Sequence, residues 1–168
     1  MERTDTAVVA DAGLLIHLDE LHCLDLLLDF NKVLLSSCVI TEVVAHRPDF
    51  SSSDLIFTIC PELLQMSDAL HAVFSLFSLH QGEQQSILIA HTTPGIIFLT
   101  DDAAARLAAS QLGIKVHGTI GVLLRSIRRG HRTKKQVAEI ISSIPQKSSL
   151  HLRQNLLHEM ITTLKTDG

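Results

Sequence analysis

The sequence predicts an α/β fold in which a short central parallel sheet is covered by helices on both faces. Short runs rich in Val, Ile and Leu alternate with helical segments, which is the pattern of parallel strands joined by helical crossovers. These runs are apolar without alternation, as expected of strands that are buried on both faces. With 168 residues, of which 46% are hydrophobic, the chain suits one globular domain with its own core.

Five runs are predicted as strands. The first two are TAVVA at residues 6–10 and KVLL at 32–35, and a third lies at 55–59. The clearest strand is GIIFLT at 95–100, and IKVH at 114–117 is the last. Helical segments separate all five, so we expect the strands to run parallel.

The helices follow from the spacing of Leu, Ile and Ala. Pro61 suits a first helical turn, and Arg47–Pro48 and Gly113 suit helix ends. Residues 47–54 are predicted as a surface loop. No repeat or linker divides the chain, so we expect a single domain over 1–168 with a helical C-terminal extension from about residue 134. The predicted helices lie at 14–30 (as two short helices), 39–45, 61–79, 82–91, 102–112, 120–129, 134–142 and 149–164.

The composition excludes several classes of protein. Cys23, Cys38 and Cys60 are an odd number of cysteines without CxxC spacing, which argues against a disulfide framework or a zinc ribbon. The ten histidines are scattered without zinc-binding spacing. There is no signal-peptide pattern and no apolar run of membrane-spanning length, so we expect a cytoplasmic protein without a membrane partner. Trp and Tyr are absent, so a base-stacking platform is not expected.

Charge is divided unevenly along the chain. Residues 1–102 hold 3 Lys and Arg against 15 Asp and Glu, whereas residues 103–168 hold 11 against 3. A fold with an acidic half and a basic half could bind cations in one place and a polyanion beside it. Two solvated faces of opposite sign would give the same numbers.

Carboxylates follow the predicted strands where parallel sheets bind their ligands. Asp11 follows the first strand directly, and Asp101 and Asp102 follow the fourth. Glu42 lies one turn into the segment after the second strand, and Glu83 opens a helix. Such a cluster is electrostatically costly unless a cation compensates it. Hard oxygen ligands suit Mg²⁺ or Mn²⁺, which support phosphodiester hydrolysis.

Two of these acids have simpler interpretations. Asp102 could serve merely as the N-cap of the following helix. Glu83 could be merely a first-turn acid that the helix dipole favours. Asp11 is harder to explain this way, because its apolar surroundings predict burial, which costs free energy without a partner.

The stretches that contain these acids resemble the PIN-domain family of Mg²⁺-dependent nucleases, in the prokaryotic branch of VapC-type toxin ribonucleases. They span residues 8–130 in the family's order, as VVADAGLLIHL, SSCVITEV, QGEQQSILIA and IIFLTDDAAARLAASQLGIKVHGTIGVLLRSIRRG. The resemblance implies a PIN-like three-layer fold and a metal-dependent endoribonuclease that hydrolyses RNA phosphodiester bonds. It also implies the toxin of a toxin–antitoxin pair, neutralised by a cognate antitoxin protein and often a homodimer.

The resemblance also assigns the site. Asp11, Glu42 and Asp102 match the family's metal-binding acids, and Asp101 could share the role of Asp102 or replace it. Glu83 is the candidate for a further acid at the start of the helix that contains ILIA. These five residues are the predicted catalytic set, with Mg²⁺ or Mn²⁺ as the cofactor.

Two positions depart from the family's pattern. Gln85 stands where related sequences often have an acid, and Ala12 stands where Thr or Ser is common. Losses of this kind around a metal typically lower affinity or activity about 10–100-fold. The alternative function is therefore a catalytically inactive or weak PIN-fold module that binds RNA or a protein.

A basic segment is predicted to hold RNA. Arg is well suited to phosphate contacts, and Arg125, Arg128 and Arg129 are spaced to share one helix face. A solvated helix end, where cations favour the dipole, is the alternative. Arg106 could reach either a carboxylate of the site or the scissile phosphate. The predicted RNA-binding residues are Arg106, Arg125, Arg128, Arg129, Arg132, Lys134 and Lys135.

The last helical segment is amphipathic. Its apolar residues lie at 150, 152, 156, 157, 160, 161 and 164. This stripe either packs on its own domain or forms a surface for an antitoxin or a second copy of the chain.

Overall fold

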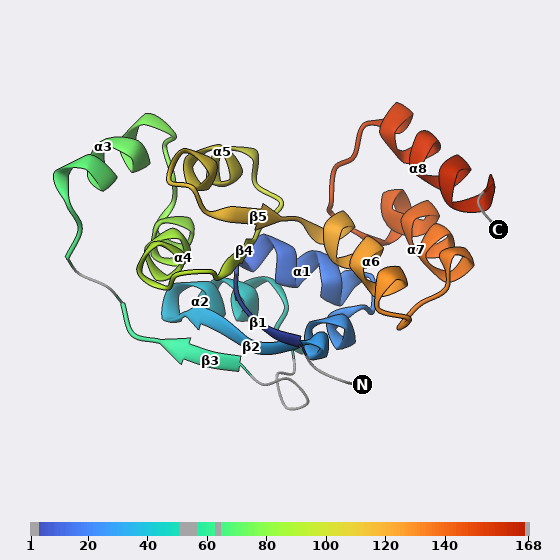
Figure 1. Ribbon diagram of the computed structural model, residues 1–168, viewed down its shortest axis with the longest axis horizontal. Coiled ribbons are helices and arrows are strands. Elements are labelled where there is room, and N and C mark those ends of the chain that lie inside the picture. Colours follow the sequence, from blue (N-terminus) through green and yellow to red (C-terminus); the bar gives the residue numbers. More distant parts are fainter. Residues whose placement is uncertain (1–3, 51–56, 63–64, 167–168) are drawn as a thin grey trace.

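The computed structural model describes residues 4–50, 57–62 and 65–166. Its centre is a five-stranded, entirely parallel sheet, which confirms the predicted fold class (Figure 1). The strands lie in the order β3-β2-β1-β4-β5. Their bounds are Thr4–Ala10 for β1, Phe30–Ser36 for β2, Phe57–Cys60 for β3, Ile97–Leu99 for β4 and Lys115–His117 for β5.

Helices cover both faces of this sheet, and alternate residues of each strand supply the two cores. Val8 and Ala10 of β1 face a core built with α1 (Ala12–Glu20), α2 (Ser37–His46), α6 (Thr119–Arg128) and α7 (Lys134–Lys147). Val9, between them, faces a second core built with α3 (Asp68–Leu76), α4 (Gln81–Thr92) and α5 (Ala103–Gln111). Both faces are therefore buried, as the uniformly apolar strands predict.

Two predicted elements need correction. The predicted helix over 61–79 is wrong in its first part, because α3 begins at Asp68, where the Ser67 hydroxyl caps it by accepting the Leu70 N–H. Residues 63–64 lie outside the described part of the chain. The predicted strand over 55–59 is observed as β3 from Phe57, and residues 55–56 also lie outside the described part, as do residues 51–54 of the predicted loop.

The other elements agree with the predictions apart from their bounds. The segment predicted as two short helices forms α1 and a 3₁₀ helix, η1 (Leu24–Asp29). Helix α7 continues beyond the predicted end through Pro145, and buried Ile144 anchors its last turn to the core. No helix in the described part is long and apolar enough to cross a membrane.

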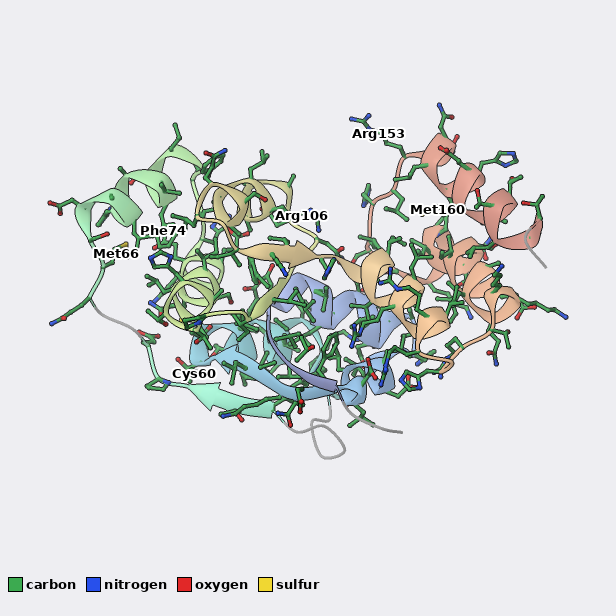
Figure 2. The ribbon with its side chains drawn as sticks, in the orientation of Figure 1. Cys60, Met66, Phe74, Arg106, Arg153 and Met160 are labelled. Carbon is green, nitrogen blue, oxygen red and sulfur yellow. The ribbon has the colours of Figure 1, made fainter. Side chains whose placement is uncertain are left out.

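Residues 148–166, which we call the C-terminal arm, pack on the rest of the domain. Its last helix, α8 (Gln154–Thr166), lies against α7, and Figure 2 shows Met160 between the two helices. Leu157, Met160, Ile161 and Leu164 are partly buried against the first core, whereas Leu156 is 46% exposed. The amphipathic stripe is therefore used mainly within the chain itself.

Candidate active site

An acidic cleft of about 1120 Å³ lies at the carboxyl ends of the central strands. The strand order reverses between β1 and β4, which is where open parallel sheets bind their ligands. All five predicted catalytic acids line this one cleft, although they come from four distant parts of the sequence. No described Lys or Arg lines the cleft. Six carboxylates and four histidines line it: Asp11, Glu42, Glu62, Glu83, Asp101, Asp102, His17, His46, His80 and His151.

Asp11 is the most deeply buried acid of the cleft. It follows β1 and caps α1, with Oδ1 accepting the Ala12 N–H at 2.7 Å and Oδ2 accepting the Thr100 hydroxyl at 2.9 Å. Burial raises the pKa of Asp11 to about 6, although these two hydrogen bonds oppose the rise. The negative charges of Glu83 and Glu42 add to it. The site therefore disfavours its own ionised carboxylate and favours a compensating positive charge.

Glu83 lies on the first turn of α4, and Glu42 lies on the second turn of the neighbouring helix α2. Glu83 accepts the His80 N–H at 2.7 Å at the start of α4, which is the helix-end role left open by the sequence. Burial raises the pKa of Glu83, and the charges of Asp102 and Glu42 raise it further against the His80 hydrogen bond. A Cβ on Gly82 would lie 3.4 Å from Glu42 Oε2, so this glycine leaves room beside the Glu42 carboxylate.

The two aspartates after β4 have different surroundings. Asp102 caps α5, with Oδ1 accepting the Ala105 N–H, and its own N–H donates to the Thr100 hydroxyl. Asp101 accepts hydrogen bonds from the N–H and hydroxyl of Thr119 and pairs with His17 Nδ1 at 2.8 Å. Burial raises the pKa of Asp101, but these bonds outweigh it and hold the pKa below its usual range. The negative charge of Asp101 is thus balanced by His17 and two hydrogen bonds from Thr119, whereas Asp11 accepts only from the neutral donors Ala12 and Thr100.

The donor set fits a hard divalent cation. Asp11, Glu42, Glu83 and Asp102 offer carboxylate oxygens, the ligands that Mg²⁺ and Mn²⁺ prefer. A Cβ on Gly13 would lie 4.0 Å from Asp11 Oδ2, so space is open beside that carboxylate as well. Within the described part of the chain, no group of three or more His, Cys, Asp or Glu side chains is arranged so that it could hold a metal ion by itself. An ion such as Mg²⁺, which keeps several waters, is bound in proteins through only one or two carboxylates.

The linker between α7 and α8 forms one wall of the cleft. Glu20, at the end of α1, accepts hydrogen bonds from the Ser148 hydroxyl and from the N–H and hydroxyl of Ser149, at 2.7–3.2 Å. The next two residues, Leu150 and His151, line the cleft, and Leu150 is buried. The C-terminal arm is therefore part of the site, which no local sequence pattern indicates.

Two arginines of the predicted basic segment, Arg125 and Arg129, already have partners within the fold. Buried Asp29, at the end of η1, accepts hydrogen bonds from Arg125 and Arg129 and pairs with His131. Burial raises the pKa of Asp29, but these partners lower it below its usual range. Arg125 also stacks over Phe30, with its guanidinium carbon 4.8 Å from the ring centre. Arg125 and Arg129 therefore share one side of α6, as their spacing predicts, and both are bound to Asp29.

The remaining predicted RNA-binding residues are spread out. Arg132 pairs with Asp25 at 2.6 Å, and Lys134 and Lys135 form the first turn of α7. Arg128 is exposed at the end of α6. Arg106 donates to the Thr100 carbonyl at 3.1 Å, so it lies next to the residue that orients Asp11.

The two departures from the family's pattern have clear positions. Gln85 is buried in α4 and does not line the cleft, so an acid at this position would not add to the described cleft wall. Ala12 is buried and donates its N–H to Asp11.

Among the residues of the site that were not predicted from the sequence are Thr100, His17 and Glu62. Thr100 bridges Asp11 and Asp102, and its place directly before two aspartates was the available signal. His17 lies on α1, six residues after Asp11, and its partner Asp101 is 84 residues away. Glu62 comes after β3 and accepts from Cys38 Sγ at 3.1 Å. Neither His17 nor Glu62 has a local signal, because their partners are distant in sequence.

Comparisons with known proteins agree with this geometry. Residues 7–166 match the model of a family described as "DUF3368: PIN domain". No curated protein is a significant match. The fold is similar to a solved structure of a PilT N-terminus domain protein, SSO1118, from the hyperthermophilic archaeon Sulfolobus solfataricus P2. That similarity has a TM-score of 0.54 at 15% identity, over 73% of this chain and 94% of the other.

Proposed function

The chain belongs to the PIN-domain family, whose members are generally nucleases, and from this premise we propose that it is a metal-dependent endoribonuclease. Its substrate would be RNA, and the reaction would be hydrolysis of a phosphodiester bond with Mg²⁺ or Mn²⁺. One observation carries the proposal above the others. Asp11, Glu42, Glu83 and Asp102 share a cleft that no described Lys or Arg lines, and burial raises the pKa of Asp11 and Glu83, with neighbouring negative charges adding to the rise.

Each acid has a role in this proposal. Asp11, Glu42 and Asp102 would hold the ion, which would supply Lewis acidity at the scissile phosphate and increase the acidity of the attacking water. Thr100 orients Asp11 and supports the backbone of Asp102. Glu83, whose pKa burial raises, would serve as a proton acceptor. Asp101 fixes the turn before α6 through Thr119, so we assign it a positioning role.

The test is RNA cleavage by the purified protein, with Asp11→Asn and Asp68→Asn as a matched pair of variants. Asp68 is exposed on α3, outside the cleft lining. We expect cleavage of mixed RNA by the native protein and by Asp68→Asn in Mg²⁺ or Mn²⁺. We expect a loss of more than about 100-fold with Asp11→Asn or EDTA, since even groups around a ligand contribute about 10–100-fold. Equal cleavage by Asp11→Asn would contradict the proposal.

Calorimetry distinguishes the alternative of a silent binding module. Native protein should take up Mn²⁺ and Asp11→Asn should not, whatever the RNA tested. If neither protein takes up Mg²⁺ or Mn²⁺ at millimolar concentration and neither cleaves RNA, the inactive-module interpretation is favoured.

The biological setting is a further part of the proposal and rests on the sequence resemblance alone. We propose a cytoplasmic toxin, with a cognate antitoxin and a homodimeric form. Induced expression should arrest growth, and Asp11→Asn expressed to the same level should not. Growth unaffected by an active native enzyme would contradict the toxin role without affecting the nuclease role.

A further inference from the structure

A group of cations around β5 combines Arg106 and Arg128, two of the predicted RNA-binding residues, with Lys115 and His117 of β5, which were not predicted. Lys115 and His117 are two residues apart on this edge strand, so their side chains lie on the same side of it, and both residues are exposed. Arg128 and His117 line one small cavity beside α6. Partial burial lowers the pKa of His117, and the charges of Arg128, Arg106, Arg125 and Lys115 lower it further. Arg125 and Arg128 line the same small cavity as the His117 imidazole.

Arg106 extends this group toward the acidic cleft. Figure 2 shows Arg106 beside β5 and between α5 and α6 in this view. One of its terminal nitrogens would lie 3.2 Å from a Cβ on Gly118, the residue directly after His117. The same nitrogen donates to the Thr100 carbonyl, so Arg106 is fixed between the cation group and the cleft.

Little negative charge compensates these cations. Among the described residues, Arg106, Lys115 and Arg128 form no ion pair with a carboxylate, in contrast to Arg125, Arg129 and Arg132. Asp101 lies close by, but its oxygens accept from Thr119 and pair with His17. A positive group without carboxylate partners is suited to an anionic ligand.

The group adjoins the cleft through the sheet itself. The Thr100 N–H donates to the His117 carbonyl at 2.9 Å, and the Thr100 hydroxyl donates to Asp11. The acidic and the cationic regions therefore meet at the carboxyl ends of neighbouring strands. Arg106 lies at this junction, because it donates to the Thr100 carbonyl.

We propose that Arg106, Lys115, His117 and Arg128 form a phosphate-binding site for the RNA strand as it leaves the acidic cleft. The inference rests on the proposed ribonuclease function, because it takes RNA as the ligand. It assigns Lys115 and His117 a role that the sequence did not indicate. It also places the main RNA contacts at β5 rather than on the Asp29-bound arginines.

The test is the salt dependence of RNA binding in a non-cleaving background. Asp11→Asn protein is titrated with two single-stranded RNA oligonucleotides of unrelated sequence, in EDTA and at several salt concentrations. The test variant adds Lys115→Gln and Arg128→Gln. The control adds Lys147→Gln and Lys165→Gln, which remove the same charge from α7 and α8. Thermal melting shows that each variant is folded.

The expected result is a change in slope. Each phosphate contact to a single strand contributes about 0.7 to the slope of log K against log salt concentration. The test variant should therefore lose about 1.4 from that slope, equally for both RNA sequences, because phosphate contacts carry no sequence information. The control should keep the slope of the Asp11→Asn parent.

Two outcomes overturn the inference, and they are distinguishable. If the parent binds RNA and the test variant keeps its slope, the phosphate site is absent while the proposed function stands. If neither the parent nor the native protein in EDTA binds either RNA, the RNA-directed function itself fails, and the inference fails with it.

Discussion

Asp11 and Asp29 are both buried aspartates, yet the protein treats their charges in opposite ways. Asp29 is held by Arg125, Arg129 and His131, and its pKa is lowered below the usual range. Asp11 has only neutral hydrogen-bond donors and two acidic neighbours, and its pKa is raised to about 6. The comparison separates a charge that stabilises the fold from a charge that the fold keeps for a ligand.

The largest effect on stability is expected at Asp29. Asp29→Asn removes the partner of two arginines, and breaking a buried ion pair typically costs about 3–5 kcal/mol in free energy of unfolding. Asp25→Asn, at the half-exposed pair with Arg132, should cost only about 0–1 kcal/mol. Urea unfolding at pH 7 measures both. Equal costs would show that Asp29 is no more structural than a surface acid.

Asp11→Asn should change the free energy of unfolding in the opposite direction to Asp29→Asn. The folded state binds the Asp11 proton more tightly than the unfolded state, so the native protein in EDTA should lose stability as pH rises from about 4 to about 6. The gap between the ordinary pKa of 3.8 and about 6 corresponds to about 3 kcal/mol as an upper bound, at 1.36 kcal/mol for each pH unit.

The variant lacks this titration while keeping an oxygen that can accept from Ala12 or Thr100. We therefore expect Asp11→Asn to be more stable than the native protein at pH 8 in EDTA, and less responsive to added Mg²⁺. Thermal unfolding across pH 4–8 measures the difference. A loss of stability at pH 8 would mean that Asp11 serves the fold as Asp29 does.

A smaller effect than at Asp29 or Asp11 is expected at Glu20, whose hydrogen bonds hold the linker that forms one wall of the cleft. Burial raises the pKa of Glu20, but hydrogen bonds from Ser149 and Ser148 lower it below the usual range. Glu20→Gln should cost about 1 kcal/mol, because the hydrogen bonds lose their ionic character. Hydrogen exchange at residues 148–151 should quicken more than elsewhere, while Glu139→Gln on α7 should leave it unchanged. Unaltered exchange would show that Glu20 does not hold residues 148–151 against the cleft.

Local patterns were sufficient for the sheet and for the acids at its edge. Asp11 and Asp102 directly follow apolar runs, and the ends of parallel strands meet at one edge, so their convergence could be predicted. Glu83 lies on the first turn of α4 and Glu42 lies one turn into α2, and both line the cleft at that edge. The helix over 61–79 was predicted too long because apolar spacing does not show that Ser67 starts the helix.

Contacts between distant residues were beyond sequence reasoning. Helical spacing placed Arg125 and Arg129 on one face, but Asp29, their partner, is 96 and 100 residues away. The bonds from Glu20 to Ser148 and Ser149 span 128 and 129 residues. Periodicity shows which side chains share one face of a helix. What α6 and the α7–α8 linker contact depends on how they pack against the rest of the fold.

The dispersed origin of the cleft has a consequence during protein synthesis. Asp102 becomes available only after β4 has been made, and β4 must pair with β1 behind Asp11. The core on that face needs Val137 and Ile141, and the cleft wall needs Leu150, so the chain must be synthesised through at least residue 150 before the acids converge. For the ribonuclease proposed above, this order would delay the assembly of the acidic cleft until that residue has been made.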